Sequence, residues 1–179
     1  HLQHLEIATE RLVIRSLTAS DHPAYFKIFG NPNIALYDDF TPIAASEAIE
    51  NIATIIENYK SNHPEQEFAV ALPAGNATIG ILYMNREPHR TLIGYHFNEL
   101  FQGNGYAVEA VSAFIKWILK TSKNPIEALV DMHNLPSLRL LQKTGFKPVD
   151  KNGDELVFRL AVEADNDADS FKTTSAIAV

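Results

Sequence analysis

The sequence contains no cysteine, which excludes disulfide scaffolds, thiolate metal sites and cysteine nucleophiles. It also lacks any run of the roughly 18 apolar residues that a membrane-spanning helix needs. Its 179 residues are 46% hydrophobic and 21% charged, which is ordinary for a globular protein and excludes disordered and low-complexity classes. We therefore expect one globular domain, no membrane partner and, most simply, a place in the cytoplasm.

An excess of basic residues is missing as well. The chain has 15 Lys and Arg against 22 Asp and Glu, a formal net charge of −7, which argues against a general nucleic-acid binder. An acidic body suits cationic or amine substrates better than polyanions. Residues 163–179 hold four acidic residues and one lysine, and we interpret them as an acidic C-terminal tail. We interpret residues 1–8 as a cloning remnant or N-terminal extension, which leaves 9–162 as the expected domain.

Hydrophobic periodicity divides the chain into strands and helices. Their order, β-α-α-β-β-β-α-β-α-β-β, combines antiparallel hairpins with one β-α-β crossover and predicts an α/β (α+β) fold with helices on the faces of a mixed sheet. In the second helix, Ile49, Ile52, Ala53 and Ile56 are spaced as one buried stripe. The expected helices cover about 18–30, from 46 onward, 106–123 and 134–145; the expected strands are 12–17, 68–72, 78–84, 92–97, 126–131, 146–149 and 156–162.

A glycine-rich segment, 102–107, joins the expected strand 92–97 directly to a helix. Glycines let a backbone approach a ligand closely, and the first amides of a helix lack internal partners and carry partial positive charge. Such a junction can seat a pyrophosphate. Two other interpretations remain open. One is a tight loop in which Gly105 adopts a positive φ; the other is a Rossmann-type nucleotide loop, which Val108 at the third glycine position disfavours.

Four motifs follow one another along the chain. They are Thr9-Glu10-Arg11-Leu12-x-x-Arg15-x-Leu17, Gly94-Tyr95, Gly103-x-Gly105-Tyr106-Ala107-x-Glu109-Ala110 and Asn134-x-x-Ser137-x-x-Leu140-Leu141-x-x-x-Gly145-Phe146. Together they resemble the GCN5-related N-acetyltransferase (GNAT) superfamily, and in particular its branch typified by the ribosomal-protein N-terminal acetyltransferases RimJ and RimL. The similarity covers about Thr9 to Leu160. Each motif alone is weak, but four in this order and spacing are specific.

This resemblance implies a mixed, mostly antiparallel sheet with a central splayed parallel pair, formed by strands 92–97 and 126–131. Acetyl-CoA, as co-substrate, is expected in the split between them. Its pantetheine would pair with the first of these strands near Phe97, because splayed strands expose unpaired backbone groups. The pyrophosphate would take the loop amides of Gln102, Gly103, Asn104, Gly105, Tyr106 and Ala107.

Four further side chains belong to the expected cofactor site. Asn134 is expected to bind the pantetheine side, to cap its helix, or to do both. Relatives often have Lys or Arg where this chain has Asn104, so one positive charge is missing from the loop. Arg139 and Lys143, four residues apart on the next helix, either face the CoA phosphates instead or form a solvated helix face.

The resemblance also implies direct acetyl transfer within a ternary complex. Ser137 corresponds to the serine that serves the CoA sulfur as general acid in the RimL-like branch; otherwise it is a first-turn serine that satisfies backbone groups. Leu141 occupies the position of the tyrosine acid of many other members. Three residues are candidates for the general base: His96 beside the expected thioester, Glu99 acting through water, and Glu155 on the last strand.

Tyr37 and Asp38 lie between the first two expected helices, where the family builds its acceptor wall; a plain surface loop is the alternative. Asp131 and His133 lack further ligands, so no metal is expected. We therefore expect an acetyl-CoA-dependent N-acetyltransferase that acts on a primary amine, either a protein or peptide N-terminus or a small molecule, as a monomer or homodimer. A non-catalytic CoA-binding module of the same fold is the alternative.

Overall fold

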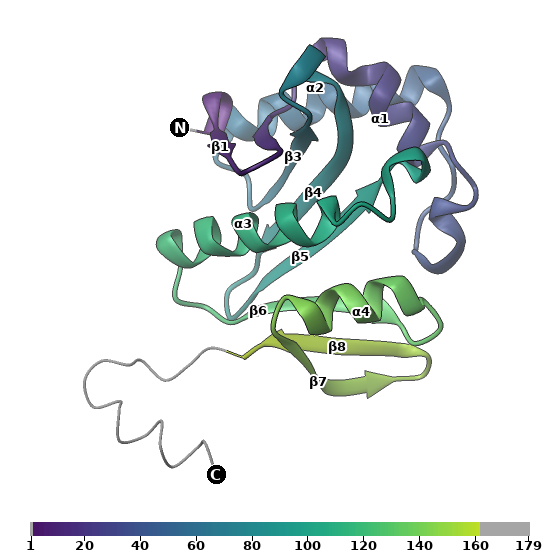
Figure 1. Ribbon diagram of the computed structural model, residues 1–179. Helices are drawn as coiled ribbons and strands as arrows, with labels where there is room; N and C mark the ends of the chain where they lie inside the picture. The colour runs from purple at the N-terminus through teal and green to yellow at the C-terminus, as the bar shows by residue number, and fades with distance from the viewer. Residues whose placement is uncertain (1, 162–179) are drawn as a thin grey trace.

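A computed structural model describes residues 2–161 as one eight-stranded sheet with four α-helices and five short 3₁₀ helices (Figure 1). The predicted order of strands and helices is confirmed, with one strand added before it. No helix in this part of the chain is long and apolar enough to cross a membrane. The elements are η1 (Leu2–His4), β1 (Glu6–Ala8), β2 (Val13–Ser16), η2 (Ala19–Asp21), α1 (His22–Phe29), η3 (Ile34–Tyr37), α2 (Ala45–Ser61), β3 (Glu65–Ala71), η4 (Ala74–Asn76), β4 (Thr78–Arg86), β5 (Thr91–Phe97), η5 (Glu99–Phe101), α3 (Tyr106–Thr121), β6 (Ile126–Asp131), α4 (Leu135–Lys143), β7 (Phe146–Asn152) and β8 (Glu155–Leu160).

The sheet has the strand order β1-β2-β3-β4-β5-β6-β8-β7. Within residues 2–161 every neighbouring pair is antiparallel except β5 and β6. These two pair in parallel only at their beginnings, where Thr91 lies opposite Ile126 and Leu92 opposite Glu127. Beyond Leu92 the two strands separate. The predicted mixed sheet with a central splayed parallel pair is confirmed.

Both faces of the sheet are covered by helices, and consecutive residues of β5 show which helix covers which face. Tyr95 points toward α4, where it meets Ser137. His96, the next residue, points to the opposite face and packs against Phe29 of α1. On the Tyr95 face, α3 runs across β4 and β5 and packs aromatic rings on Phe68 of β3. Ser137 on the α4 side and His96 on the α1 side both line one opening between β5 and β6.

The buried stripe of α2 differs from the predicted one. Ile49 is 53% exposed and Ala53 is also exposed, whereas Ile52 is buried as predicted. The face of α2 that carries Tyr59 points to the core instead. The Tyr59 ring stacks on Phe68 with 5.7 Å between ring centroids, and its hydroxyl forms hydrogen bonds with the backbone of β3 and of the residue after β2. Burying a tyrosine removes more apolar surface from water than burying one isoleucine does. The buried face of α2 is therefore shifted by about one residue from the predicted face. The buried positions are Ala48, Ile52, Ile55 and Tyr59.

The segment before residue 9 belongs to the sheet. β1 pairs with β2, and the amide of Leu5 donates to Ser16 Oγ at 3.0 Å. Leu2, Leu5 and Ile7 pack against the core. The described fold therefore begins before the expected domain boundary at residue 9. The expected acidic tail, 163–179, lies outside the described residues.

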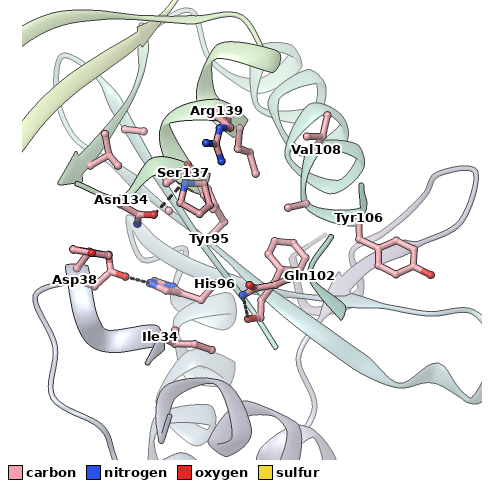
Figure 2. Close-up of a pocket in the computed structure, with 18 of the residues that line it drawn as sticks. Ile34, Asp38, Tyr95, His96, Gln102, Tyr106, Val108, Asn134, Ser137 and Arg139 are labelled. Carbon is pink, nitrogen blue, oxygen red and sulfur yellow. Dashed lines mark hydrogen bonds and ion pairs between the residues drawn. The ribbon is translucent and has the colours of Figure 1, made fainter. Parts of the chain in front are cut away.

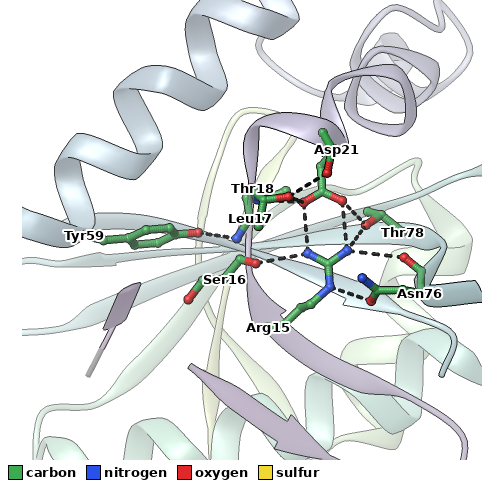
Figure 3. A network of polar contacts seen from close by, with 9 residues as sticks. Arg15, Ser16, Leu17, Thr18, Asp21, Tyr59, Asn76 and Thr78 are labelled. Atoms are coloured by element: carbon green, nitrogen blue, oxygen red, sulfur yellow. Dashed lines mark hydrogen bonds and ion pairs between the residues drawn. The ribbon is translucent and has the colours of Figure 1, made fainter. Parts of the chain in front are cut away.

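Arg15, the second arginine of the first motif, ties the N-terminal hairpin to the rest of the domain (Figure 3). Its guanidinium forms two bonds of 2.9 Å to the Asp21 carboxylate and one of 3.0 Å to Thr78 Oγ1. A further bond of 2.9 Å reaches Asn76 Oδ1. The Asp21 side chain is 7% exposed and that of Arg15 14%. The motif residue thus has a structural role, joining β2, η2 and the β3–β4 turn.

Candidate active site

The separation of β5 from β6 opens a cavity of about 630 Å³, a size typical of small-molecule sites (Figure 2). Residues of η3, β5, η5, β6, α4 and the loop before α3 line it. Most of the predicted site residues contribute to its wall, whereas the Asn104 and Glu155 side chains do not. The predicted residues that line the cavity are Tyr37, Asp38, His96, Phe97, Glu99, Gln102, Gly103, Gly105, Tyr106, Ala107, Asn134, Ser137, Arg139 and Lys143.

One wall of the cavity is a free strand edge. β5 keeps its partner β4 from Thr91 to Phe97, but on the other side its pairing with β6 ends at Leu92. Backbone N–H and C=O groups along this edge therefore face the cavity without a strand partner among the described residues. The Phe97 carbonyl accepts a bond of 3.2 Å from Gln102 Nε2, which joins the end of the strand to the loop. An extended amide-bearing chain can pair with this edge.

The loop between η5 and α3 reaches its shape through two glycines. Gly103 and Gly105 have φ values of +84° and +79°, the left-handed region that glycine tolerates best. The Asn104 amide folds back to donate to the Phe101 carbonyl at 3.2 Å, so its side chain supports the loop instead of lining the cavity. Helix α3 begins at Tyr106. Its first backbone amides, which have no partner within the helix, lie at the cavity wall.

Ser137 and Tyr95 form the polar centre on the α3–α4 side. Asn134 caps α4 by accepting from the Ser137 amide at 3.3 Å, as the sequence predicts. The Ser137 hydroxyl lies 2.6 Å from that of Tyr95. Burial raises the pKa of Tyr95 to about 12, so its proton stays on the oxygen at neutral pH. Tyr95 is not among the site residues predicted from the sequence; the alternation of Ile93, Tyr95 and Phe97 along β5 is the signal that identifies it.

His96 lies on the other side of the opening, toward α1. Its Nε2 is 3.1 Å from Asp38 Oδ2, and the rings of Phe29 and Phe40 meet the imidazole at 5.1 and 5.5 Å. Figure 2 shows His96 and Ser137 pointing to different sides of the cavity. Because the opening connects the two sides, a reacting group placed within it can be reached from both.

Charged side chains divide the cavity into two ends. Arg139 and Lys143 line it from α4. Asp38 and Glu99 line it from η3 and η5. The Glu99 carboxylate accepts bonds of 2.7 and 3.3 Å from two asparagine amides in the loop after α1. The α4 wall therefore carries two cations and the η3–η5 wall two carboxylates; a third carboxylate, Asp131 at the end of β6, also lines the cavity.

One of the predicted candidate bases lies apart from this group. Glu155, at the start of β8, is exposed, pairs with Asp131 and Asn152 in the sheet and does not line the cavity. Asp131 and His133 contact one another at 3.0 Å. Among residues 2–161 no group of three or more His, Asp or Glu side chains is arranged to hold a metal ion.

Comparison with known proteins identifies the family of this chain. Residues 11–147 match the family model described as Acetyltransferase (GNAT) domain. The "Uncharacterized N-acetyltransferase p20" of Bacillus licheniformis is 27% identical over 143 residues, 78% of this chain and 80% of that protein.

Solved structures share the fold. A GNAT-family acetyltransferase of Bacillus anthracis superposes with a TM-score of 0.75 at 22% identity, covering 87% of this chain and 98% of that one. A RimL ribosomal L7/L12 alpha-N-protein acetyltransferase in complex with coenzyme A superposes with a TM-score of 0.72 at 18% identity, covering 87% of this chain and 96% of that one. The chain belongs to the GNAT family of acetyl-CoA-dependent N-acetyltransferases.

Proposed function

We propose that this cavity holds acetyl-CoA from the α3–α4 side and a primary amine from the α1 side, and that acetyl transfer takes place in the opening between β5 and β6. The observation that carries this proposal is the single cavity that spans the sheet, with cations at one wall and carboxylates at another. The acceptor is a protein or peptide N-terminus, as the name of the RimL relative states for that protein, or a small-molecule amine.

The cofactor half of the cavity fits the chemistry of acetyl-CoA. The free edge of β5 offers N–H and C=O groups to the two amides of pantetheine. The loop before α3 offers backbone amides at the positive end of a helix, a suitable seat for pyrophosphate. Arg139 and Lys143 add the positive charge that Asn104 does not supply.

The acceptor half fits an amine. Asp38 and Glu99 attract a positively charged group, and the aromatic rings around His96 shield the reacting nitrogen from water. Tyr37 lines the same wall. An ammonium group must lose a proton before it can attack, so a base is needed close to the opening.

The reaction forms one N–C bond and breaks the C–S bond; starting from the ammonium form, the nitrogen loses two protons and the sulfur gains one. His96, with Nε2 donating to Asp38, accepts the first proton on Nδ1. The neutral amine attacks the acetyl carbonyl, and a backbone N–H of β5 near His96 and Phe97 stabilises the oxyanion. The C–S bond then breaks, and Ser137 gives its proton to the CoA thiolate while Tyr95 donates to the Ser137 oxygen. The second proton of the nitrogen passes through water to restore the Ser137–Tyr95 pair, and His96 releases its proton to solvent.

A thermal-shift titration with acetyl-CoA, CoA and NAD tests the binding part of this proposal. A ligand at 100 times its dissociation constant adds about 2.7 kcal/mol, or several degrees for a domain of this size. We expect acetyl-CoA and CoA to raise the melting temperature and NAD to leave it unchanged. An amine screen that follows release of the free CoA thiol then tests turnover. Tight CoA binding without turnover of any amine favours the alternative, a non-catalytic CoA-binding module.

A further inference from the structure

Two residues of different motifs meet on the outer side of the glycine-rich loop. Arg11 Nε lies 2.7 Å from Glu109 Oε1, although the two residues are 98 positions apart. The backbone amide of Arg11 donates to Glu109 Oε2 at 2.8 Å, and the Thr9 hydroxyl donates to the same oxygen at 2.6 Å. Both oxygens of one carboxylate are thus occupied by the segment between β1 and β2. These bonds lower the pKa of Glu109 against the effect of its partial burial.

The same arginine also contacts the loop itself. Arg11 Nη1 donates to the Asn104 carbonyl at 2.9 Å, and its guanidinium lies 4.6 Å from the centre of the Tyr106 ring. A Cβ atom added at Gly105 would lie 3.4 Å from Arg11 Nη2. Arg11 therefore contacts Asn104 and Tyr106 and lies beside Gly105 between them. It does not line the cavity, so it contacts the loop from behind.

We propose that Arg11 and Glu109 act as a positioning pair that holds the loop 102–107 ready for the pyrophosphate of acetyl-CoA. This inference rests on the proposed binding of acetyl-CoA in the cavity. A segment with glycines at two of six positions has many accessible conformations, and ordering it upon binding would weaken affinity. A loop already held by Arg11 loses less entropy when the ligand arrives.

The pair also solves an electrostatic problem. Glu109 lies in the first turn of α3, the helix whose amides face the cavity. A carboxylate there would repel the diphosphate and offset the attraction of the helix terminus. The guanidinium of Arg11 neutralises it and bonds the loop at a carbonyl, not at a backbone amide. Arg11 and Glu109 thus keep the acidic side chain from opposing the ligand.

The test compares CoA with a ligand that lacks its diphosphate and nucleotide. Dissociation constants are measured for CoA and for acetyl-pantetheine, which lacks the diphosphate and nucleotide, with wild type, Arg11→Gln and Arg11→Lys. Losing charge-assisted bonds is expected to weaken CoA binding roughly tenfold or more in Arg11→Gln, with less than a twofold change for acetyl-pantetheine. Arg11→Lys keeps the positive charge but loses the planar guanidinium that bonds two groups at once, so an intermediate loss of CoA affinity is expected. Amide hydrogen exchange of residues 102–107 without ligand should be faster in both variants.

Arg159→Gln is the matched control, because Arg159 forms the same Nε–carboxylate contact of 2.7 Å with Glu127 in β6 and lies outside the cavity wall. It should leave both constants unchanged. Equal weakening of both ligands in Arg11→Gln, or unchanged CoA binding and loop exchange in both Arg11 variants, would overturn the positioning role. A wild-type protein that binds acetyl-pantetheine but not CoA would also overturn it. If wild type bound neither ligand, the proposed function itself would fall.

Discussion

The hydroxyl oxygens of Tyr95 and Ser137 lie 2.6 Å apart across the junction of β5 and α4. The Tyr95 proton is retained at neutral pH because burial raises the pKa of this residue to about 12. Tyr95 can therefore donate to Ser137 while Ser137 donates to a third atom in the cavity. This arrangement makes the serine a better proton donor than an isolated hydroxyl, since negative charge developing on its oxygen is stabilised at once.

We predict that Ser137→Ala lowers kcat by roughly 10²-fold, the range found when a proton donor is removed, with little change in the affinity for acetyl-CoA. Tyr95→Phe should give a smaller loss, about tenfold, because the serine remains. The rate at which free CoA thiol is released at saturating acetyl-CoA and amine measures kcat for both variants.

Ser46→Ala, at the exposed start of α2, is the control and should leave kcat unchanged. A Ser137→Ala enzyme with normal kcat and a lower melting temperature would assign Ser137 to structure alone.

The second prediction concerns His96 and Asp38, whose side chains lie 3.1 Å apart on the α1 side. If His96 removes the amine proton, His96→Gln should lower kcat/KM for the amine roughly 10²-fold. The loss should shrink as pH rises toward the amine's own pKa, about 8 for an N-terminus and about 10 for an alkylamine, because the amine then deprotonates in water. Asp38→Asn should lower kcat/KM for the amine less than His96→Gln does, and this loss should also shrink as pH rises. Rates measured from pH 6 to 10 test both variants.

His89→Gln, in the exposed loop between β4 and β5, controls for the loss of an imidazole. A deficit in His96→Gln that stays constant from pH 6 to 10 would argue for a packing role.

Local sequence signals account for most of the fold. Glycine spacing at 103 and 105 predicts the turn into α3, and both residues have positive φ. Asn134 followed by proline two residues later predicts the start of α4, and its side chain caps that helix. These features depend on neighbouring residues, so a single sequence can reveal them.

Features that depend on distant residues were harder to predict. Period-two alternation places His96 and Tyr95 on opposite faces, but only the position of α4 shows that Tyr95 meets the candidate acid. The face of α2 is set by Tyr59 stacking on Phe68 of another element, which periodicity within the helix does not reveal. Glu155 shares a strand pair with the cavity residue Asp131, yet its own side chain lies outside the cavity. In each case tertiary packing decides among several locally acceptable arrangements.

The third prediction tests the buried pair Arg15–Asp21. Removing one member of a buried ion pair leaves the other charge without a partner, so Asp21→Asn should lower the free energy of unfolding by about 2–4 kcal/mol. The Arg15 guanidinium and other hydrogen bonds hold the pKa of Asp21 below 3.8. The stabilisation is therefore complete above pH 3.8 and lost as pH falls further. Urea unfolding at pH 7 measures the difference.

Glu57→Gln breaks a pair of the same charges on the surface of α2, where Lys60 Nζ lies 3.1 Å away and both side chains are more than half exposed. It should cost less than about 0.5 kcal/mol. Similar costs at the two sites would show that the Arg15 network adds no stability of its own.

The last prediction concerns Glu67, a partly buried carboxylate of β3 that faces Tyr25 of α1. It lines a second, smaller cavity and accepts a bond of 3.2 Å from the Tyr25 hydroxyl. Burial raises its pKa from 4.5 to about 7. The folded protein therefore binds this proton more tightly than the unfolded chain, and the free energy of unfolding should fall as pH rises from about 4.5 to 7.

Glu67→Gln removes the titration and keeps an oxygen to accept from Tyr25. The variant should match wild type near pH 4.5 and exceed it in stability by about 1–3 kcal/mol at pH 8, because only wild type must then hold a buried negative charge. Urea unfolding of both proteins at the two pH values measures this difference. Glu50→Gln, on the exposed side of α2, controls for the change in net charge. An equal gap between Glu67→Gln and wild type at both pH values would mean that the Glu67 carboxylate ionises in the folded protein as freely as in the unfolded chain.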